Sequence, residues 1–262
     1  MPNKYLGREG APFGEEVWAV LDAVMVEAAK AQLAGRRLLP LEGPYGLGLK
    51  AIPLPDEEVA SGIFVSKTLP LVFLVEEFEI PLRDLAAYER DGLAFNAQPV
   101  AQAAMACARR EDELIFYGAA GLTGLLTAPG VQKVQLSDWS AVGAAMDDLI
   151  RAVTALDEAG FHGPYALGLA PARYNLLFRR YPDGPMTEME HIQTLVTGGV
   201  VKVPILKDGG VLLAVGRQYA SIVLGQDMTV GFIGPDEEKL EFSVSESLAL
   251  YLRVPASVCV LE

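Results

Sequence analysis

The chain has 262 residues, of which 51% are hydrophobic and 21% charged, enough for one large domain or two small ones with a true core. A formal net charge of −13 and the lack of any basic run disfavour binding that depends on contacts to nucleic-acid phosphates. No apolar run approaches the ~20 residues that a membrane-spanning helix needs. From the charge we expect no nucleic-acid partner, and from the short apolar runs no membrane partner.

The two cysteines, Cys107 and Cys259, lie in apolar helical and strand-like contexts, where free thiols are commonly buried. Unpaired thiols of this kind fit a reducing compartment. The N-terminal residues lack the apolar core of a signal peptide, so we expect a cytoplasmic protein.

The first helix is predicted over residues 15–33, after a polar arm that contains Gly and Pro, and Gly35 is interpreted as its stop. Apolar residues recur along one face of this helix at helical spacing, namely Val17, Trp18, Leu21, Val24, Met25 and Ala28. Such a face must be covered, either by the rest of the chain or by a partner.

A long two-stranded ribbon is predicted over residues 47–73, where short strand-like pieces alternate with prolines and an acidic tip. It has little core of its own, because isolated two-stranded sheets are only marginally stable in water. We therefore expect the ribbon to lie on another surface. A strand over residues 69–80 and a helix over residues 82–91 are predicted to follow.

The longest predicted helix covers residues 96–118, with Asn96 as its cap, Pro99 in its first turn and Gly118 at its end. Acidic residues late in a helix oppose the helix dipole and need cationic partners. The charges near its end therefore predict a salt-bridged structural hub in preference to a catalytic or di-iron pair. This hub consists of Arg109, Arg110, Glu111, Asp112 and Glu113.

The second half of the chain mixes helices and strands, which predicts an α+β fold. A helix over residues 142–159 is expected to be capped by Ser137 or Asp138, and an exposed loop is expected where Pro and Gly gather at 179–185. Further helices are predicted over 171–178 and 189–196, and strands over 165–169, 200–204, 211–215, 220–224, 229–233, 239–246, 248–254 and 258–261.

Catalytic and metal-binding motifs are missing from the sequence. The only two histidines, His162 and His191, do not belong to a cluster with zinc-ligand spacing. The sequence has no nucleophile elbow, no phosphate-binding loop and no dinucleotide fingerprint. We expect no catalytic residue and no metal site, and the remaining features (an arm, a ribbon and an apolar helix) are typical of an assembly.

Four segments in the right order resemble one known family. They are LAGRR leading into EGPYG at 33–46, EDELIFYG at 111–118, GPY at 163–165 and LGQDMTVG at 224–231. On these segments the chain resembles an encapsulin, a bacterial shell-forming protein with the tailed-phage major capsid fold. The resemblance covers nearly the whole chain.

The resemblance implies a peripheral domain, an axial domain and an extended loop. Residues 1–46 would form an N-terminal arm and a lumen-facing helix of the peripheral domain. Residues 47–73 would be the extended loop, lying across a neighbouring subunit. Residues 74–133, with the spine helix, and residues 222–262 would complete the peripheral domain, and residues 134–221 would form the axial domain.

The resemblance also implies two functional surfaces. A groove beside the lumen-facing helix would capture the C-terminal targeting peptide of a cargo protein in extended form, through Trp18, Leu21, Arg36, Asp227, Met228 and Val230. An Asp at Leu21 or Val230 is then expected to abolish cargo loading while leaving shells intact. A five-fold pore would be lined by Arg179, Arg180, Tyr181, Pro182, Asp183, Gly184 and Pro185, with the pore charge set by Asp183 and the two arginines.

Some encapsulins bind flavin on a tryptophan in the helix that precedes the spine. Arg83 stands where that tryptophan would be, and Tyr88 lies one turn further on. This departure disfavours flavin, and no other cofactor is expected.

The favoured hypothesis is a non-enzymatic shell protein of a type 1 encapsulin nanocompartment. It would self-assemble into an icosahedral homo-oligomer, T=1 in class, with pores for small ions and substrates. The shell would enclose a ferritin-like iron-storage protein or a dye-decolorising peroxidase. Two alternatives are a phage-type capsid protein that packages nucleic acid and a carboxylate-based hydrolase or protease that uses Glu111 or Glu113. The acidic balance disfavours the first alternative, and the missing motifs disfavour the second.

Overall fold

The computed structural model describes residues 4–92, 94–119, 121–182 and 184–262. The chain forms two compact units from interleaved segments. The first unit holds the chain up to Leu33 together with Gly43–Glu111 and Val223–Ala249, and the second holds Ala34–Glu42, Asp112–Ile222 and Leu250–Glu262. Helices and sheets occur in both units, which confirms the predicted α+β class.

The first unit is organised around β13 (Lys239–Leu252), which belongs to a five-stranded sheet ordered β1-β11-β13-β12. The strand β6 (Val72–Pro81) also pairs with β13, antiparallel and in unbroken register from Lys239↔Pro81 to Leu248↔Val72. On the other side of β13 lies β12 (Thr229–Asp236). The sequence predicted two strands where β13 is one. That prediction was wrong because Ser247, at the expected break, keeps its backbone paired with Gly225 and Gln226.

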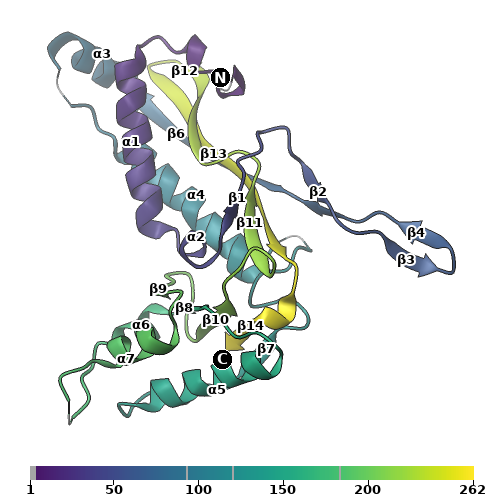
Figure 1. Ribbon diagram of the computed structural model, residues 1–262. Coiled ribbons are helices and arrows are strands. Elements are labelled where there is room, and N and C mark those ends of the chain that lie inside the picture. The colour runs from purple at the N-terminus through teal and green to yellow at the C-terminus, as the bar shows by residue number, and fades with distance from the viewer. Residues whose placement is uncertain (1–3, 93, 120, 183) are drawn as a thin grey trace. The chain divides into compact units, whose positions relative to one another are not determined.

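Helices pack on this sheet within the first unit, with α1 (Glu15–Gln32) on β12 and α3 (Leu82–Asp91) at the end of β6 (Figure 1). The part of α4 (Gln98–Tyr117) that belongs to this unit contributes to the same core. The predicted apolar face of α1 is confirmed, because it buries Val17, Trp18, Leu21, Met25 and Ala29. The rings of Phe78 and Phe242 stack beneath it at 5.1 Å between centroids. Short 3-10 helices η1 (Lys4–Leu6) and η2 (Arg8–Gly10) precede α1.

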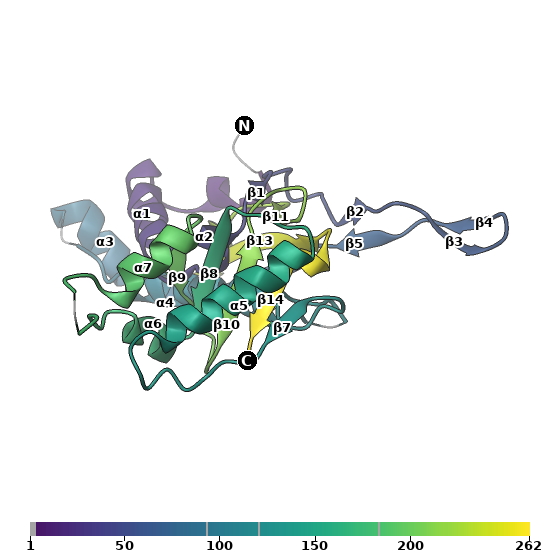
Figure 2. The ribbon, with the colours of Figure 1, turned by 60° about the horizontal axis from the view of Figure 1, so that its bottom comes forward.

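The predicted ribbon is present as two successive two-stranded pairs that run away from the sheet of the first unit (Figures 1 and 2). The inner pair is β2 (Ala51–Pro53) with β5 (Thr68–Pro70), and the outer pair is β3 (Glu57–Ala60) with β4 (Ile63–Val65). Every residue of the outer pair is exposed. The apolar side chains at the tip of the ribbon are therefore not buried by the ribbon itself.

The long helix α4 (Gln98–Tyr117) has the ends that the sequence predicts. The side chain of Asn96 accepts a hydrogen bond from the backbone N–H of Gln98 at 3.0 Å. Gly118 ends the helix with a φ of 79°, and its N–H donates to the carbonyl oxygen of Leu114. The boundary between the two compact units falls inside α4, after Glu111.

The second unit contains a five-stranded sheet ordered β7-β14-β10-β8-β9, with α5 (Ala144–Glu158) across it in Figure 2. The β7/β14 and β8/β9 pairs are parallel and the other two are antiparallel. The strands are Gln132–Val134, Val258–Leu261, Gly210–Ala214, Tyr165–Leu169 and Val200–Lys202 in that order. The unit also holds α2 (Gly35–Leu38), β1 (Leu41–Glu42), α6 (Pro171–Leu176), α7 (Glu188–Leu195), η3 (Pro255–Ser257) and β11 (Ala220–Leu224) up to Ile222.

The predicted cap of α5 was wrong. The helix begins after Gly143, which offers no side-chain cap. Ser137 instead donates its backbone N–H and its hydroxyl to the carboxylate of Asp148, at 2.7 and 2.9 Å, and the indole N–H of Trp139 donates to the same oxygen at 2.8 Å. The hydrogen bonds from Ser137 hold the incoming loop on the side of α5. They also keep the pKa of Asp148 below its usual range, against the opposing effect of burial.

Gly118 and Gly121 offer a matched pair of substitutions, because both have a positive φ, 79° and 88°. A Cβ at Gly118 would clash with the carbonyl oxygen of Leu122 and lie 2.8 Å from the nitrogen of Gly124, whereas one at Gly121 meets open space. We predict that G121A lowers the free energy of unfolding by about 1 kcal/mol through backbone strain alone, and G118A by more than about 2 kcal/mol. Chemical denaturation measures both, and equal losses would contradict the predicted clash.

Candidate functional site

The hub at the end of α4 depends on one buried carboxylate. The side chain of Asp112 is 1% exposed and accepts hydrogen bonds from the backbone N–H groups of Ala34, at 2.9 Å, and Gly35, at 2.8 Å. These donors stand at the start of α2, where backbone N–H groups have no partner inside the helix. Asp112 therefore caps α2 from a different segment of the chain.

Gly35 has a different role from the predicted one. It does not end α1, which stops at Gln32, but begins α2 against the end of α4. A Cβ at Gly35 would lie 2.7 Å from the Cδ1 atom of Ile115 and 3.3 Å from the carboxylate of Asp112. Glycine is needed here because it lets the backbone approach the carboxylate closely.

The other hub residues lie in different environments. Arg110 forms an ion pair with Glu76 of β6 at 2.7 Å, while Arg109 and Glu113 are exposed. Glu111 is fully buried. Since Glu111 and Glu113 differ in this way, they do not form the open pair of carboxylates that a hydrolase needs.

The two thiols are buried and inert. Cys107 is fully buried on α4, with its sulfur 3.6 Å from a carboxylate oxygen of the buried Glu246. Burial first, and then the negative charge of Glu246, raise the pKa of the Cys107 thiol far above its usual range. Burial alone raises the pKa of Cys259 to about 12. A thiol with a raised pKa supplies little of the nucleophilic thiolate.

The predicted docking residues do not line an open groove in the first unit. Their exposed fractions are 8% for Trp18, 0% for Leu21, 9% for Met228 and 0% for Val230. All four belong to the apolar core. Asp227 is exposed, and its carboxylate accepts a hydrogen bond from the N–H of Met228 at 2.8 Å. Arg36 belongs to the second unit and is partly exposed.

Burial at Leu21 and Val230 corrects the expected effect of an Asp there. A charge in this core would lose its hydration without gaining a partner, which costs several kcal/mol. Both substitutions would destabilise the first unit itself. Neither one tests cargo docking.

The N-terminal arm covers part of this core, and Arg8 fixes it there. The guanidinium of Arg8 forms a two-pronged ion pair with Asp22 of α1, at 2.7 and 2.6 Å. It also donates to the carbonyl oxygen of Val230, at 2.9 Å, and to the hydroxyl of Thr229, at 3.4 Å. Its carbon Cζ lies 4.5 Å from the ring centroid of Trp18. Sequence reasoning missed Arg8, because a lone arginine in a polar arm gives no signal.

The predicted pore loop is anchored at its base. Arg179 pairs with the fully buried Glu188 at 2.9 Å, and Glu188 also accepts the N–H of Gly143 at 2.8 Å. Thr187 and Glu190 form a capping box at the start of α7, and the backbone and hydroxyl hydrogen bonds from Thr187 lower the pKa of Glu190.

The rest of the loop is more open. The ring of Tyr181 lies 4.6 Å from that of His191, and burial, then the charge of Glu188, raise the pKa of Tyr181. Arg180, Pro182, Gly184 and Pro185 are exposed. Asp183 lies outside the described residues. The charge of Arg179 is balanced by Glu188, so Arg180 is the described cation that remains open on this loop.

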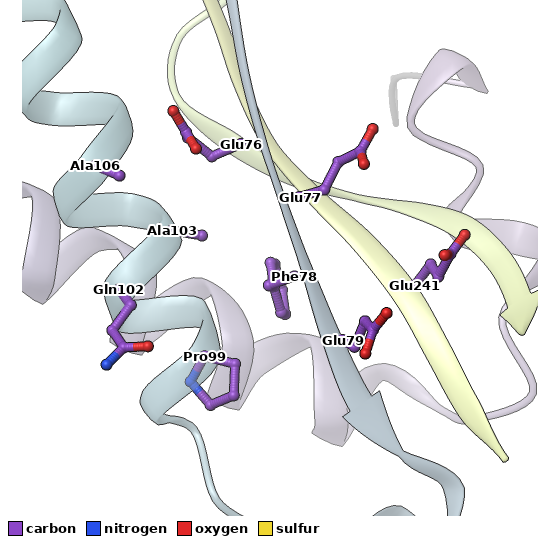
Figure 3. A pocket seen from close by; sticks show the side chains of 9 residues that line it. All are labelled: Glu76, Glu77, Phe78, Glu79, Pro99, Gln102, Ala103, Ala106 and Glu241. Carbon is purple, nitrogen blue, oxygen red and sulfur yellow. The ribbon is translucent and has the colours of Figure 1, made fainter.

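A hollow of about 560 Å³ lies beside β6 and α4, and Figure 3 shows Phe78 on the side of β6 toward α4 and Glu77, Glu79 and Glu241 on its other side. Its walls carry Glu76, Glu77, Glu79 and Glu241 on the strands and Pro99, Gln102, Ala103 and Ala106 on the helix. Carboxylate oxygens of Glu79, Asp236 and Glu241 lie within 4.8 Å of one another. Lys239 forms an ion pair with Glu79, so a cation of the chain itself offsets one of these three carboxylates.

Comparison with solved structures identifies the fold. A virus-like particle from Pyrococcus furiosus matches with a TM-score of 0.78 at 22% identity, over 94% of this chain and 100% of that one. The capsid of Myoviridae phage XM1 matches with a TM-score of 0.63 at 12% identity, over 85% of this chain and 88% of that one. The fold is therefore the one shared by this virus-like particle and the tailed-phage capsid.

Comparison of sequences then shows the family. The family described as "Encapsulating protein for peroxidase" matches residues 3–249. A type 1 encapsulin shell protein of Myxococcus xanthus is 33% identical over 100% of this chain and 97% of its own length. A diheme-cytochrome–encapsulin shell fusion protein of Kuenenia stuttgartiensis is 28% identical over 95% of this chain and 73% of its own length. The chain belongs to the encapsulin family and is a self-assembling shell protein.

The match over nearly the whole chain favours the encapsulin hypothesis over the phage alternative. In the part of the chain that the structure describes, no helix is long and apolar enough to span a bilayer.

Asp112 and Glu113 provide a test of the carboxylate cap, because they are adjacent acids with opposite burial. We predict that D112A lowers the free energy of unfolding by about 2 kcal/mol or more, since the N–H groups of Ala34 and Gly35 are left buried without an acceptor. E113A should stay within about 0.5 kcal/mol of wild type, as surface changes usually do. Denaturant unfolding measures both, and a small effect of D112A would show that the cap contributes little.

Proposed function

We propose that the protein forms a closed icosahedral shell of the smallest class, T=1, in the cytoplasm. The shell encloses a ferritin-like protein or a peroxidase that is held by its C-terminal targeting peptide. The description of the matching family names a peroxidase. A Pyrococcus furiosus relative, 25% identical over 74% of this chain and 53% of its own length, is a ferritin-like–encapsulin shell fusion protein. The shell protein itself is not an enzyme, and the chemistry belongs to the cargo.

The apolar tip of the ribbon is the observation that supports assembly. Val59, Ile63, Phe64 and Val65 are between 46% and 64% exposed on strands that carry no core. Clustered apolar side chains on an outstretched element favour burial against another surface. A neighbouring subunit provides that surface in our proposal.

Phe64, at 64% exposure, allows assembly to be tested apart from folding. We predict that F64D yields folded subunits that fail to form shells, since a charge replaces apolar contact area but disturbs no core. F64L should still assemble, because it keeps an apolar side chain. Electron microscopy and gel filtration report assembly, and circular dichroism reports folding. Normal shells from F64D would remove the tip from the interface.

The charged members of the predicted docking set remain candidates for cargo binding. Asp227 is exposed two residues before β12 begins, and Arg36 is partly exposed. The apolar residues of the set are buried, and they can contact a peptide only if the N-terminal arm that covers them moves. We retain Asp227 as a direct contact of the targeting peptide.

Asp227 and Asp236 form a matched pair of exposed acids near the two ends of β12. We predict that D227N lowers cargo loading severalfold, because one charged contact to the peptide is lost, while D236N leaves loading unchanged. Shells co-produced with the cargo encoded beside the shell gene are purified, and cargo per subunit is measured by densitometry. Equal loading in the two variants would exclude Asp227 from the docking site.

Two further features belong to this proposal. The loop at residues 179–185 lines the five-fold pore, with Arg180 and Asp183 setting its charge. Flavin is not bound, because Arg83 is exposed where some relatives have a tryptophan, and Tyr88 packs edge-on against Phe95 with centroids 5.4 Å apart.

A further inference from the structure

The N-terminal arm lies on the surface that the docking prediction selected. Figure 1 shows the first described residues beside β12. The backbone of Gly7 approaches so closely that a Cβ there would lie 2.5 Å from the carbonyl oxygen of Phe232. Phe13 packs against Trp18, with ring centroids 5.1 Å apart and the ring planes tilted by 50°. Trp18 and Val230 are therefore buried partly by the arm.

We propose that residues 4–13 form a displaceable strap that occupies the cargo-docking surface until a targeting peptide replaces it. This inference rests on the proposed capture of a C-terminal peptide and adds a regulatory step to it. The strap covers an apolar surface in the empty subunit. Its displacement exposes the residues that the peptide binds.

The construction of the strap favours displacement. Neither η1 nor η2 buries a single residue, and each is one turn long. Its turns are closed by backbone hydrogen bonds from the N–H of Gly10 to the carbonyl oxygen of Gly7 and from the N–H of Ala11 to that of Arg8. Segments with few buried contacts open at low free energy while the rest of the fold stays intact.

The contacts of Arg8 indicate the chemistry of the peptide that replaces the strap. Arg8 satisfies three acceptors: the carboxylate of Asp22, the carbonyl oxygen of Val230 and the hydroxyl of Thr229. When the strap is displaced, these acceptors lose their hydrogen-bond donor and the ring of Trp18 loses its cation. A matching peptide is extended, carries apolar side chains, and places one Lys or Arg where Arg8 was.

The strap lowers the apparent affinity for such a peptide. When only a fraction of subunits has the surface open, the apparent dissociation constant rises by the inverse of that fraction. Weakening the strap should therefore strengthen binding, which is the opposite of what removing a direct contact does. This sign separates a strap from a binding residue.

The test compares R8A and D22N, which break the same ion pair from either side, with R83A. Arg83 is an exposed arginine on α3, so R83A makes the same charge change as R8A away from the strap. The probe is a fluorescent protein that carries the C-terminal tail of the cargo encoded beside the shell gene, co-produced in limiting amount. We expect R8A to raise probe per shell subunit about fivefold, a typical size of coupling between sites, and R83A to match wild type. D22N should raise it less than R8A, because it loosens the strap but also removes the acceptor for the cation of the peptide.

Tryptophan fluorescence reports the strap without any cargo. Trp139 is fully buried in the second unit and gives a constant signal, while Trp18 lies under the arm. Acrylamide should quench empty R8A shells more than wild-type shells, because Trp139 stays buried in both and only Trp18 becomes accessible. R8K, which keeps the charge but loses the two-pronged geometry, should fall between wild type and R8A in both measurements.

The outcomes separate the strap from the proposed function. Equal or lower loading in R8A, with Trp18 more accessible, overturns the strap while wild-type loading still supports peptide capture. An unchanged Trp18 accessibility in R8A, R8K and D22N also overturns the strap. A wild-type shell that never takes up the probe contradicts the proposed peptide capture itself, whatever the strap does.

Discussion

A buried carboxylate that caps a helix from another segment is the constraint on which the start of the second unit depends. Asp112 lies near the C-terminal end of α4, where the helix dipole disfavours an acid. Two backbone N–H groups at the N-terminal end of α2 stabilise its carboxylate there. The arrangement fixes the path of the chain between α1 and β1. It also favours a glycine at position 35, because a Cβ there would lie 2.7 Å from the Cδ1 atom of Ile115 and 3.3 Å from the Asp112 carboxylate.

Much of the fold could be predicted because its signals are local. Asn96 and Gly118 mark the ends of α4 through the backbone geometry of helix termini, and prolines with an acidic tip mark the ribbon. The partner of Asp112 could not be predicted, since its donors are backbone N–H groups that any residue carries. The predicted cap of α5 was wrong for a related reason. Ser137 donates its hydrogen bond to the carboxylate of Asp148, one turn inside the helix, and not to a group at the helix start.

The site was harder to predict than the fold, because burial is a property of the whole chain. Trp18 and Val230 have the apolar character of a peptide-binding groove, and the same character places them in a core when another segment covers them. The family resemblance indicated which residue positions matter, but not whether another segment of the chain covers them. Arg8, which holds that surface closed, has no sequence motif to mark it.

The physical character of the Arg8 contacts suits a strap rather than a permanent seal. The ion pair with Asp22 is partly exposed, with side-chain exposures of 27% and 38%, and exposed pairs contribute only about 0–1 kcal/mol. Its five contacts fix the register of the arm more than they add free energy. A shell subunit needs such a cover, because an open apolar surface around Trp18 would favour wrong association during assembly. A cover held weakly by directional contacts meets that need and still yields to a peptide that repeats the same contacts.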